Sequence, residues 1–237
     1  MIAIARVALD TLYDDLLSKY SITDEKVVKL ISELDYELDK WLLTLPKHLQ
    51  WSDDEQDSFK FTQRCCLMVS FYFIQTFIHR PFVGVLNPFS LSSSSTSICL
   101  QAGMSLSHIC KLFKTKSKDP RTDTTSTNVF SCLIALFSCK WTLKLKSNAT
   151  DYKIIDECID NLHDYIKSRE GRFYVAGRLS DIIEYLKEHP DEVNHQGISI
   201  EDVFNIDLDE MLNSSMLSAN FFHTLPSLTD MDEFGIN

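Results

Sequence analysis

An acidic cluster between residues 53 and 57 is the first group of side chains in this sequence that could do chemistry. It reads Asp53-Asp54-Glu55-Gln56-Asp57, and carboxylate oxygens are the ligands that Mg²⁺ prefers. The cluster lies in a polar connection that follows Pro46 and Trp51. Acidic residues in such a connection also favour the start of a helix, so Ser52 and the acids after it are expected to begin the next helix. The pattern alone therefore does not establish a metal site.

The histidines and cysteines form no recognisable nucleophile or metal constellation. His48, His79, His108 and His163 are far apart in the sequence, each is typical of a helix end or a surface, and no Ser or Cys partner is evident beside any of them. The seven cysteines, at positions 65, 66, 99, 110, 132, 139 and 158, are scattered without a C-x-x-C pair, which favours small buried hydrophobes over a disulfide framework or a zinc site. The sequence predicts a protein that is not an enzyme and holds no cofactor or metal in these residues.

Negative charge is concentrated at the C-terminal end. Residues 188–237 contain eleven acids and no Lys or Arg, which leaves 23 acids against 23 bases for residues 1–187. The whole net charge of −11 thus belongs to the last fifty residues. Bulky apolar residues lie between these acids, a mixture typical of an acidic, hydrophobic interaction segment.

This asymmetry predicts two parts: a helical body, residues 1–187, and an acidic tail, residues 188–237. The N-terminus has no secretory signal, because Arg6 and Asp10 interrupt its apolar positions. The longest uncharged run, residues 65–78, is shorter than the roughly 20 residues that a membrane helix needs. An intracellular protein without a membrane span is expected.

Helical periodicity accounts for nearly all of the body. We expect an all-α fold, an irregular antiparallel multi-helix array followed by a largely disordered acidic tail. The expected helices cover about residues 3–19, 23–45, 59–79, 98–116, 127–146, 152–168 and 175–188, with Pro46 and Arg80-Pro81 as stop signals. Val7 belongs to the expected inward stripe of the first helix, and residues 90–97, rich in serine, are expected to be a loop or the beginning of a helix outside the core.

Four sequence words occur in an order that resembles a known family. They are LDKWLLTLPKHLQW (residues 38–51), FYFIQTFIHRPFV (71–83), CLQAGMSLSHIC (99–110) and FYVAGRLSDIIEYL (173–186). Together they resemble the later part of the fungal-specific transcription factor domain, the middle homology region of fungal zinc binuclear cluster regulators. The resemblance implies that His79, Arg80 and Pro81 end a buried helix, and that Ala176 and Gly177 let the last helix approach its neighbour closely.

The chain departs from the family pattern at its N-terminal side. The six-cysteine zinc cluster of complete members has no counterpart here, and the first half of the middle region is also missing. The expectation is a truncated domain whose DNA contacts and zinc belong to a missing module, because a neutral body with an acidic tail repels phosphate. The resemblance implies a nuclear regulator of RNA polymerase II transcription, and the sequence leaves homodimerisation open.

The acidic tail is the expected working segment of such a regulator. It would bind transcriptional coactivators or mediator-type proteins by folding on contact, with acids keeping it accessible and apolar anchors supplying contact area. The candidate anchors are Phe204, Leu208, Met211, Leu212, Phe221, Phe222, Leu225 and Phe234. The other structure weighed for this segment is a C-terminal helix that folds back on the body with its acidic face outward.

Two further functions remain open from sequence. One is a domain that senses a small apolar inducer, with the aromatic run Phe71–Phe82 lining the cavity, although an ordinary packed core explains the same residues more simply. The other, from a different class, is an enzyme, because residues 53–57 resemble the DDxxD motif with which all-α terpenoid synthases hold magnesium. No second metal motif accompanies it, and the motif precedes its helix here instead of ending one.

Overall fold

The structure, a computed structural model, describes residues 1–8, 24–54, 57–84, 91–116, 125–144 and 152–189. These residues contain seven α-helices and two 3₁₀ turns and no strand. The α-helices are α1 (Ile2–Ala8), α3 (Asp24–Leu43), α4 (Ser58–His79), α5 (Ser92–Lys116), α6 (Ser126–Lys144), α7 (Tyr152–Lys167) and α8 (Tyr174–Glu188). The 3₁₀ turns are η2 (Lys47–Leu49) and η3 (Arg80–Phe82). The predicted all-α class is confirmed, and the acidic tail lies outside the described residues.

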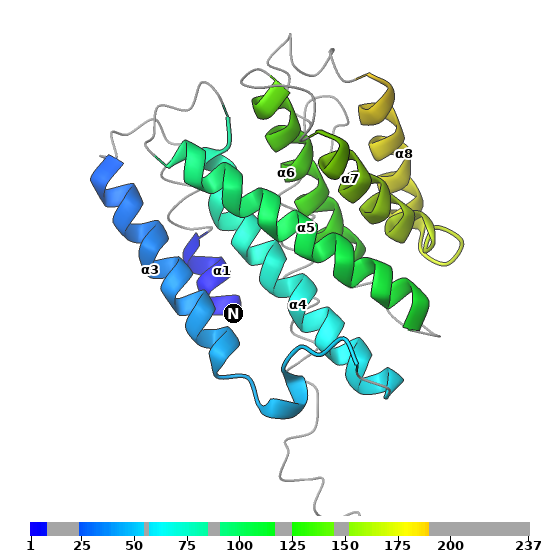
Figure 1. Cartoon of the computed structure of the whole chain (residues 1–237), viewed down its shortest axis with the longest axis horizontal. Coiled ribbons are helices and arrows are strands. Elements are labelled where there is room, and N and C mark those ends of the chain that lie inside the picture. Colours follow the sequence, from blue (N-terminus) through cyan, green and yellow to red (C-terminus); the bar gives the residue numbers. More distant parts are fainter. Residues whose placement is uncertain (9–23, 55–56, 85–90, 117–124, 145–151, 190–237) are drawn as a thin grey trace, which may run out of the picture.

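The helix α4 is the centre of the fold because it is apolar on nearly every side. It packs against α1, α3, α5 and α6, while α7 packs against α5, α6 and α8. In Figure 1, α1 and α3 lie on the left, α4 and α5 cross the middle, and α6 to α8 lie on the right. Phe61, Phe73 and Phe77 of α4 are buried, and each fully buried aromatic ring contributes about 1.5–3 kcal/mol of transfer free energy.

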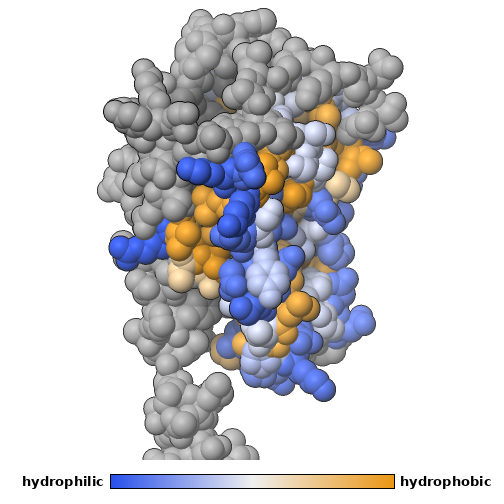
Figure 2. All heavy atoms as spheres, turned by 90° about the vertical axis from the view of Figure 1, so that its left-hand side faces the viewer, coloured by the Kyte–Doolittle hydropathy of each residue, from blue (hydrophilic) through white to orange (hydrophobic). Residues whose placement is uncertain are grey.

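The face that bears α1 and α3 mixes hydrophilic and apolar side chains (Figure 2). The sequence correctly placed Val27, Ile31 and Leu38 of α3 on the buried side. It was wrong about Val7, which is 46% exposed, because the short α1 turns Ala5 and Ala8 inward instead. The remainder of the first predicted helix, residues 9–19, lies outside the described residues.

Helix α4 begins one residue before the expected position 59. Of Ser52 and the acids expected to begin it, Asp57 is the N-cap. The Asp57 backbone is extended, and its carboxylate accepts hydrogen bonds from the amides of Phe59 and Lys60. A carboxylate in this position satisfies amides that no helical carbonyl can reach. These hydrogen bonds also lower the pKa of Asp57.

The serine run begins a helix, which was one of the two expected structures, but the expectation that it lies outside the core is wrong. Helix α5 begins at Ser92, and Ser95 and Thr96 are both buried. Thr96 Oγ1 donates to the carbonyl of Ser92 at 2.7 Å, so local hydrogen bonds let small polar side chains enter the core.

Helices α5 and α6 approach each other closely at Gly103. A Cβ built on Gly103 would lie 2.7 Å from Leu136 Cγ and 2.8 Å from Leu136 Cδ1. Gly177 was expected to serve this purpose for α8, and that expectation is wrong: the nearest atom to a Cβ there is Glu170 Cβ at 3.8 Å, an ordinary contact. Ala176 is fully buried, as expected.

Candidate functional site

The eight candidate anchors of the acidic tail lie outside the described residues. They are Phe204, Leu208, Met211, Leu212, Phe221, Phe222, Leu225 and Phe234. Their role as partner-binding residues therefore stays a prediction. The body nevertheless presents two openings and two buried histidine networks that can be described atom by atom.

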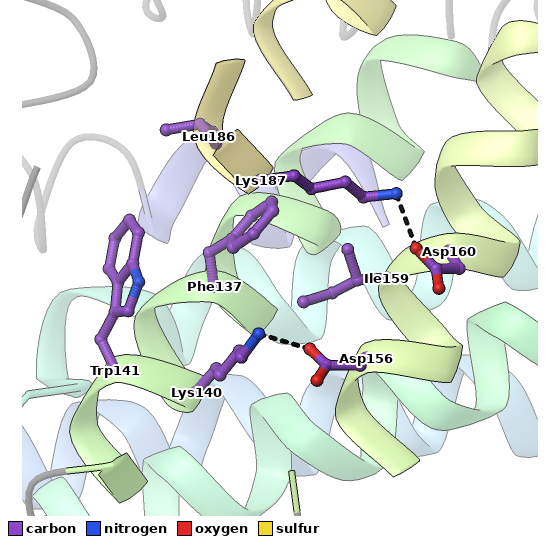
Figure 3. Close-up of a pocket in the computed structure, with 8 residues that line it drawn as sticks. All are labelled: Phe137, Lys140, Trp141, Asp156, Ile159, Asp160, Leu186 and Lys187. Atoms are coloured by element: carbon purple, nitrogen blue, oxygen red, sulfur yellow. Dashed lines mark hydrogen bonds and ion pairs between the residues drawn. The ribbon is translucent and has the colours of Figure 1, made fainter. Parts of the chain in front are cut away.

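A pocket of about 310 Å³ opens between α6, α7 and α8 (Figure 3). We call it the α6–α8 pocket, and its lining residues are Phe137, Lys140, Trp141, Asp156, Ile159, Asp160, Leu186 and Lys187. The rings of Phe137 and Trp141 lie 5.8 Å apart and form an aromatic wall. Ile159 and Leu186 complete the apolar part of the lining.

Two ion pairs form the polar rim of this pocket. Lys140 pairs with Asp156, and Lys187 Nζ donates to Asp160 Oδ1 at 2.7 Å (Figure 3). The rim is neutral as a whole, and the lining offers no thiol, hydroxyl or imidazole group. An aromatic wall with paired charges at its edge suits the binding of a small molecule that has an apolar body and a polar end.

The buried ring of His163 links this pocket to the helix pair α7 and α8. Its Nδ1 lies 3.0 Å from Lys187 Nζ, and its Nε2 lies 3.0 Å from Ser180 Oγ. The ammonium group can only donate, so Nδ1 accepts and Nε2–H donates to the serine. Burial and then the positive charge of Lys187 lower the pKa of His163, despite the nearby carboxylates of Glu184 and Asp164.

This network makes the stability of the body depend on pH. The unfolded His163 has the ordinary value of 6.5 and the folded one a lower pKa, so the unfolded chain binds more protons and the free energy of unfolding falls as pH drops below 6.5. We expect His163→Gln to make this fall shallower. Urea unfolding of both chains between about pH 7.5 and about pH 5 measures it. A fall of equal steepness in both chains would contradict the assignment.

Two buried networks contradict the expectation that no serine lies beside a histidine: that of His163 and Ser180 and a second one around His79. His79 Nδ1 is 3.0 Å from Ser95 Oγ, and His79 Nε2 is 3.1 Å from Asp35 Oδ1. A neutral ring that donates Nε2–H to the carboxylate accepts the serine hydroxyl at Nδ1. Serine, histidine and aspartate in series is the arrangement of a catalytic triad, but Ser95 is 0% exposed. No substrate can reach this hydroxyl, so the network ties α3, α4 and α5 together.

The acidic cluster is engaged in local contacts at two of its aspartates. Asp57 caps α4, and Asp53 Oδ1 accepts from Trp51 Nε1 at 2.7 Å while its Oδ2 lies 3.3 Å from His108 Nε2. Glu55 and Gln56 lie outside the described residues. Among the residues that the structure describes, no group of three or more His, Cys, Asp or Glu side chains is arranged to hold a metal ion.

A second opening, of about 400 Å³, lies between α4, α5 and the connection after η2. We call it the α4–α5 groove, and it is lined by Trp51, Met68, Tyr72, Met104, Ser105, His108 and Ile109. Its rim is fixed by Asp53, which holds both Trp51 and His108. Sequence reasoning missed this groove because its residues come from three separate segments. For Phe71–Phe82 the sequence left open a cavity but favoured an ordinary packed core, and Phe71, Phe73, Phe77 and Phe82 are indeed buried in the core.

The seven cysteines are free thiols, and all but Cys66 are buried. Burial raises the pKa of Cys66 to about 11 and that of Cys132 to about 12. A thiol that stays protonated at neutral pH is a poor nucleophile and a poor metal ligand. The prediction of small buried hydrophobes is therefore confirmed.

No helix in the described part of the chain is both long enough and apolar enough to cross a bilayer. The chain matches no protein-family model, no curated protein and no solved structure. The described residues therefore define the class only as an α-helical domain. It has two openings, the α6–α8 pocket with its polar rim and the α4–α5 groove with two methionines in its lining.

Proposed function

We propose that this chain is the regulatory and activation part of a fungal zinc-cluster-type transcription factor. In this proposal residues 1–187 form a helical regulatory domain, and residues 188–237 activate RNA polymerase II transcription in the nucleus. The tail recruits coactivators or mediator-type proteins. A separate zinc-cluster module contacts DNA, and the chain has no catalytic role.

The observation that carries the proposal is the position of the charge. All eleven units of net negative charge follow Lys187, which lies in the last turn of α8, the final described helix. Apolar anchors alternate with the acids that follow. A segment of this composition gains contact area from the anchors only when a partner supplies a groove, and the acids steer it towards basic surfaces.

The body supports the proposal through the places that the four resembling words occupy. The second word covers the end of α4 and η3, where His79 joins α3 to α5. The third lies on α5 and contains Gly103, on which α6 packs. The fourth covers α8. The end of α4 at His79 and the burial of Ala176 agree with what the resemblance implies for these residues, whereas Gly177 makes no close approach.

A reporter assay tests the proposal. Residues 188–237 fused to a heterologous DNA-binding domain are expected to activate transcription. Replacing Phe204, Leu208, Met211 and Leu212 by Ala should lower activation at least about tenfold, because losing several anchors costs more than about 2 kcal/mol of binding. The matched control replaces Asn213, Ser214, Ser215 and Ser218 by Ala and should retain activity. Equal activity of the two variants would refute the role of the anchors.

A second function is favoured by the α6–α8 pocket. Its aromatic wall and neutral rim suit a small, largely apolar inducer. A ligand bound there would contact Leu186 and Lys187 and so influence how α8 packs on α6 and α7. The acidic tail follows α8 in the sequence. This function replaces the cavity that the sequence suggested along α4 and is compatible with the main proposal.

A further inference from the structure

We propose that the α4–α5 groove binds residues 202–212 of the same chain. This inference rests on the proposed function, since it describes how the activation segment is regulated. The groove and the segment match in side-chain type and in reach, and the α5 side of the groove also matches the segment in charge.

The groove offers the surface that an amphipathic helix needs. Met68 and Met104 lie in its lining together with Trp51 and Tyr72. Methionine side chains adapt their shape to a guest, and exposed Trp and Tyr supply rigid contact area. Met104 is 48% exposed, so its thioether is free to close on a bound side chain.

The charge around the groove differs between its two sides: Asp53 lies on the side of the connection after η2, and the basic residues lie on α5. Helices α4 and α5 contain no Asp or Glu between their printed bounds. On α5, His108 lies in the lining and Lys111 follows one turn later on the same side. Lys111 is exposed. Lys116 donates to the carbonyl of Asp53, the residue whose carboxylate lies beside His108.

Residues 202–212 carry the complementary pattern. Phe204, Leu208, Met211 and Leu212 are spaced by three and four positions, so an induced helix would place them on one face. Asp202, Asp207, Asp209 and Glu210 would then flank this face and meet the bases of α5. This is the helix-in-groove mode of peptide recognition.

The connection is long enough. Phe204 is 15 positions after His189, the last described residue, and so many residues can span up to about 50 Å. A domain of this size has a radius of gyration of only about 16 Å. Tethering also raises the effective concentration of the segment into the millimolar range, so even a weak contact is populated. While docked, the anchors are hidden from a coactivator.

Hydrogen exchange of the full-length chain tests the docking. Amides of residues 204–212 are expected to be protected, and Met104→Glu should lower this protection at least about fivefold, because it places an anion in the groove. The control is Ile154→Glu, which changes a 53% exposed side chain of α7 and should leave protection unchanged. Both variants should unfold at the wild-type temperature, since both positions are exposed.

Three outcomes would overturn the inference: no protection of these amides in the wild type, equal protection in Met104→Glu, or protection that rises with protein concentration. The last would show docking between chains. A reporter separates this inference from the proposed function. With the full chain fused to a DNA-binding domain, Met104→Glu should raise activation severalfold. If exchange shows docking but residues 188–237 alone do not activate, the docking stands and the proposed function fails.

Discussion

His79→Ala is expected to lower the free energy of unfolding by about 3 kcal/mol. The imidazole is 2% exposed, so its removal leaves a cavity and also leaves the buried Ser95 hydroxyl without its acceptor. Cavity formation and an unsatisfied buried group each cost about 1–3 kcal/mol. Because His79 bonds both Ser95 and Asp35, three helices lose a common contact. Urea denaturation followed by circular dichroism measures the change.

The matched control is His108→Ala. His108 also contacts an aspartate, but it is exposed, so its loss should change stability by less than about 0.5 kcal/mol. The double variant His79→Ala with Ser95→Ala should lose less free energy of unfolding than the two single variants lose together. In the double variant no buried hydroxyl or imidazole remains without its hydrogen-bond partner. Additive effects would show that the two side chains do not interact.

Gly103→Ala is expected to destabilise the fold by about 2 kcal/mol, although Ala normally favours a helix over Gly by about 1 kcal/mol. The added methyl group would lie within 3 Å of Leu136 side-chain atoms. Leu136 is 0% exposed, so it cannot turn out into solvent. The helices α5 and α6 must separate or Leu136 must leave its rotamer.

Gly177→Ala is the control for this prediction. A Cβ at Gly177 has only an ordinary contact, at 3.8 Å, so the same substitution should stabilise the fold by up to about 1 kcal/mol. Opposite signs for the two variants in thermal or urea unfolding would confirm that the α5–α6 approach is specific. Stabilisation by both variants would show that Leu136 can yield.

The helices of the body could be predicted because each shows either a clear helical periodicity of apolar residues or a long apolar run. Helix α4 is an example: its apolar run allows no other structure, and Pro81 must end it. The start of α4 was predicted to within one residue, but its cap was not singled out, because Ser52, Asp53 and Asp57 are all acceptable caps. In the structure the backbone of Asp57 is extended, and its carboxylate accepts from the first amides of the helix.

The buried polar groups could not be predicted, because they depend on partners that are distant in sequence. Ser95 and His79 are 16 positions apart, and His79 and Asp35 are 44 apart. A serine-rich stretch looks like a loop until a histidine from another helix accepts its hydroxyl. The α4–α5 groove was missed for the same reason. The Gly within CLQAGMSLSHIC was a usable signal, since a glycine inside an apolar helix often marks close packing.

The central claim is that folding belongs to residues 1–187 and activation to residues 188–237. The most direct test fuses each part separately to the same DNA-binding domain and compares reporter transcription at matched protein levels. The account predicts strong activation by residues 188–237 and none by residues 1–187. Activation by residues 1–187, or by neither part, would contradict it.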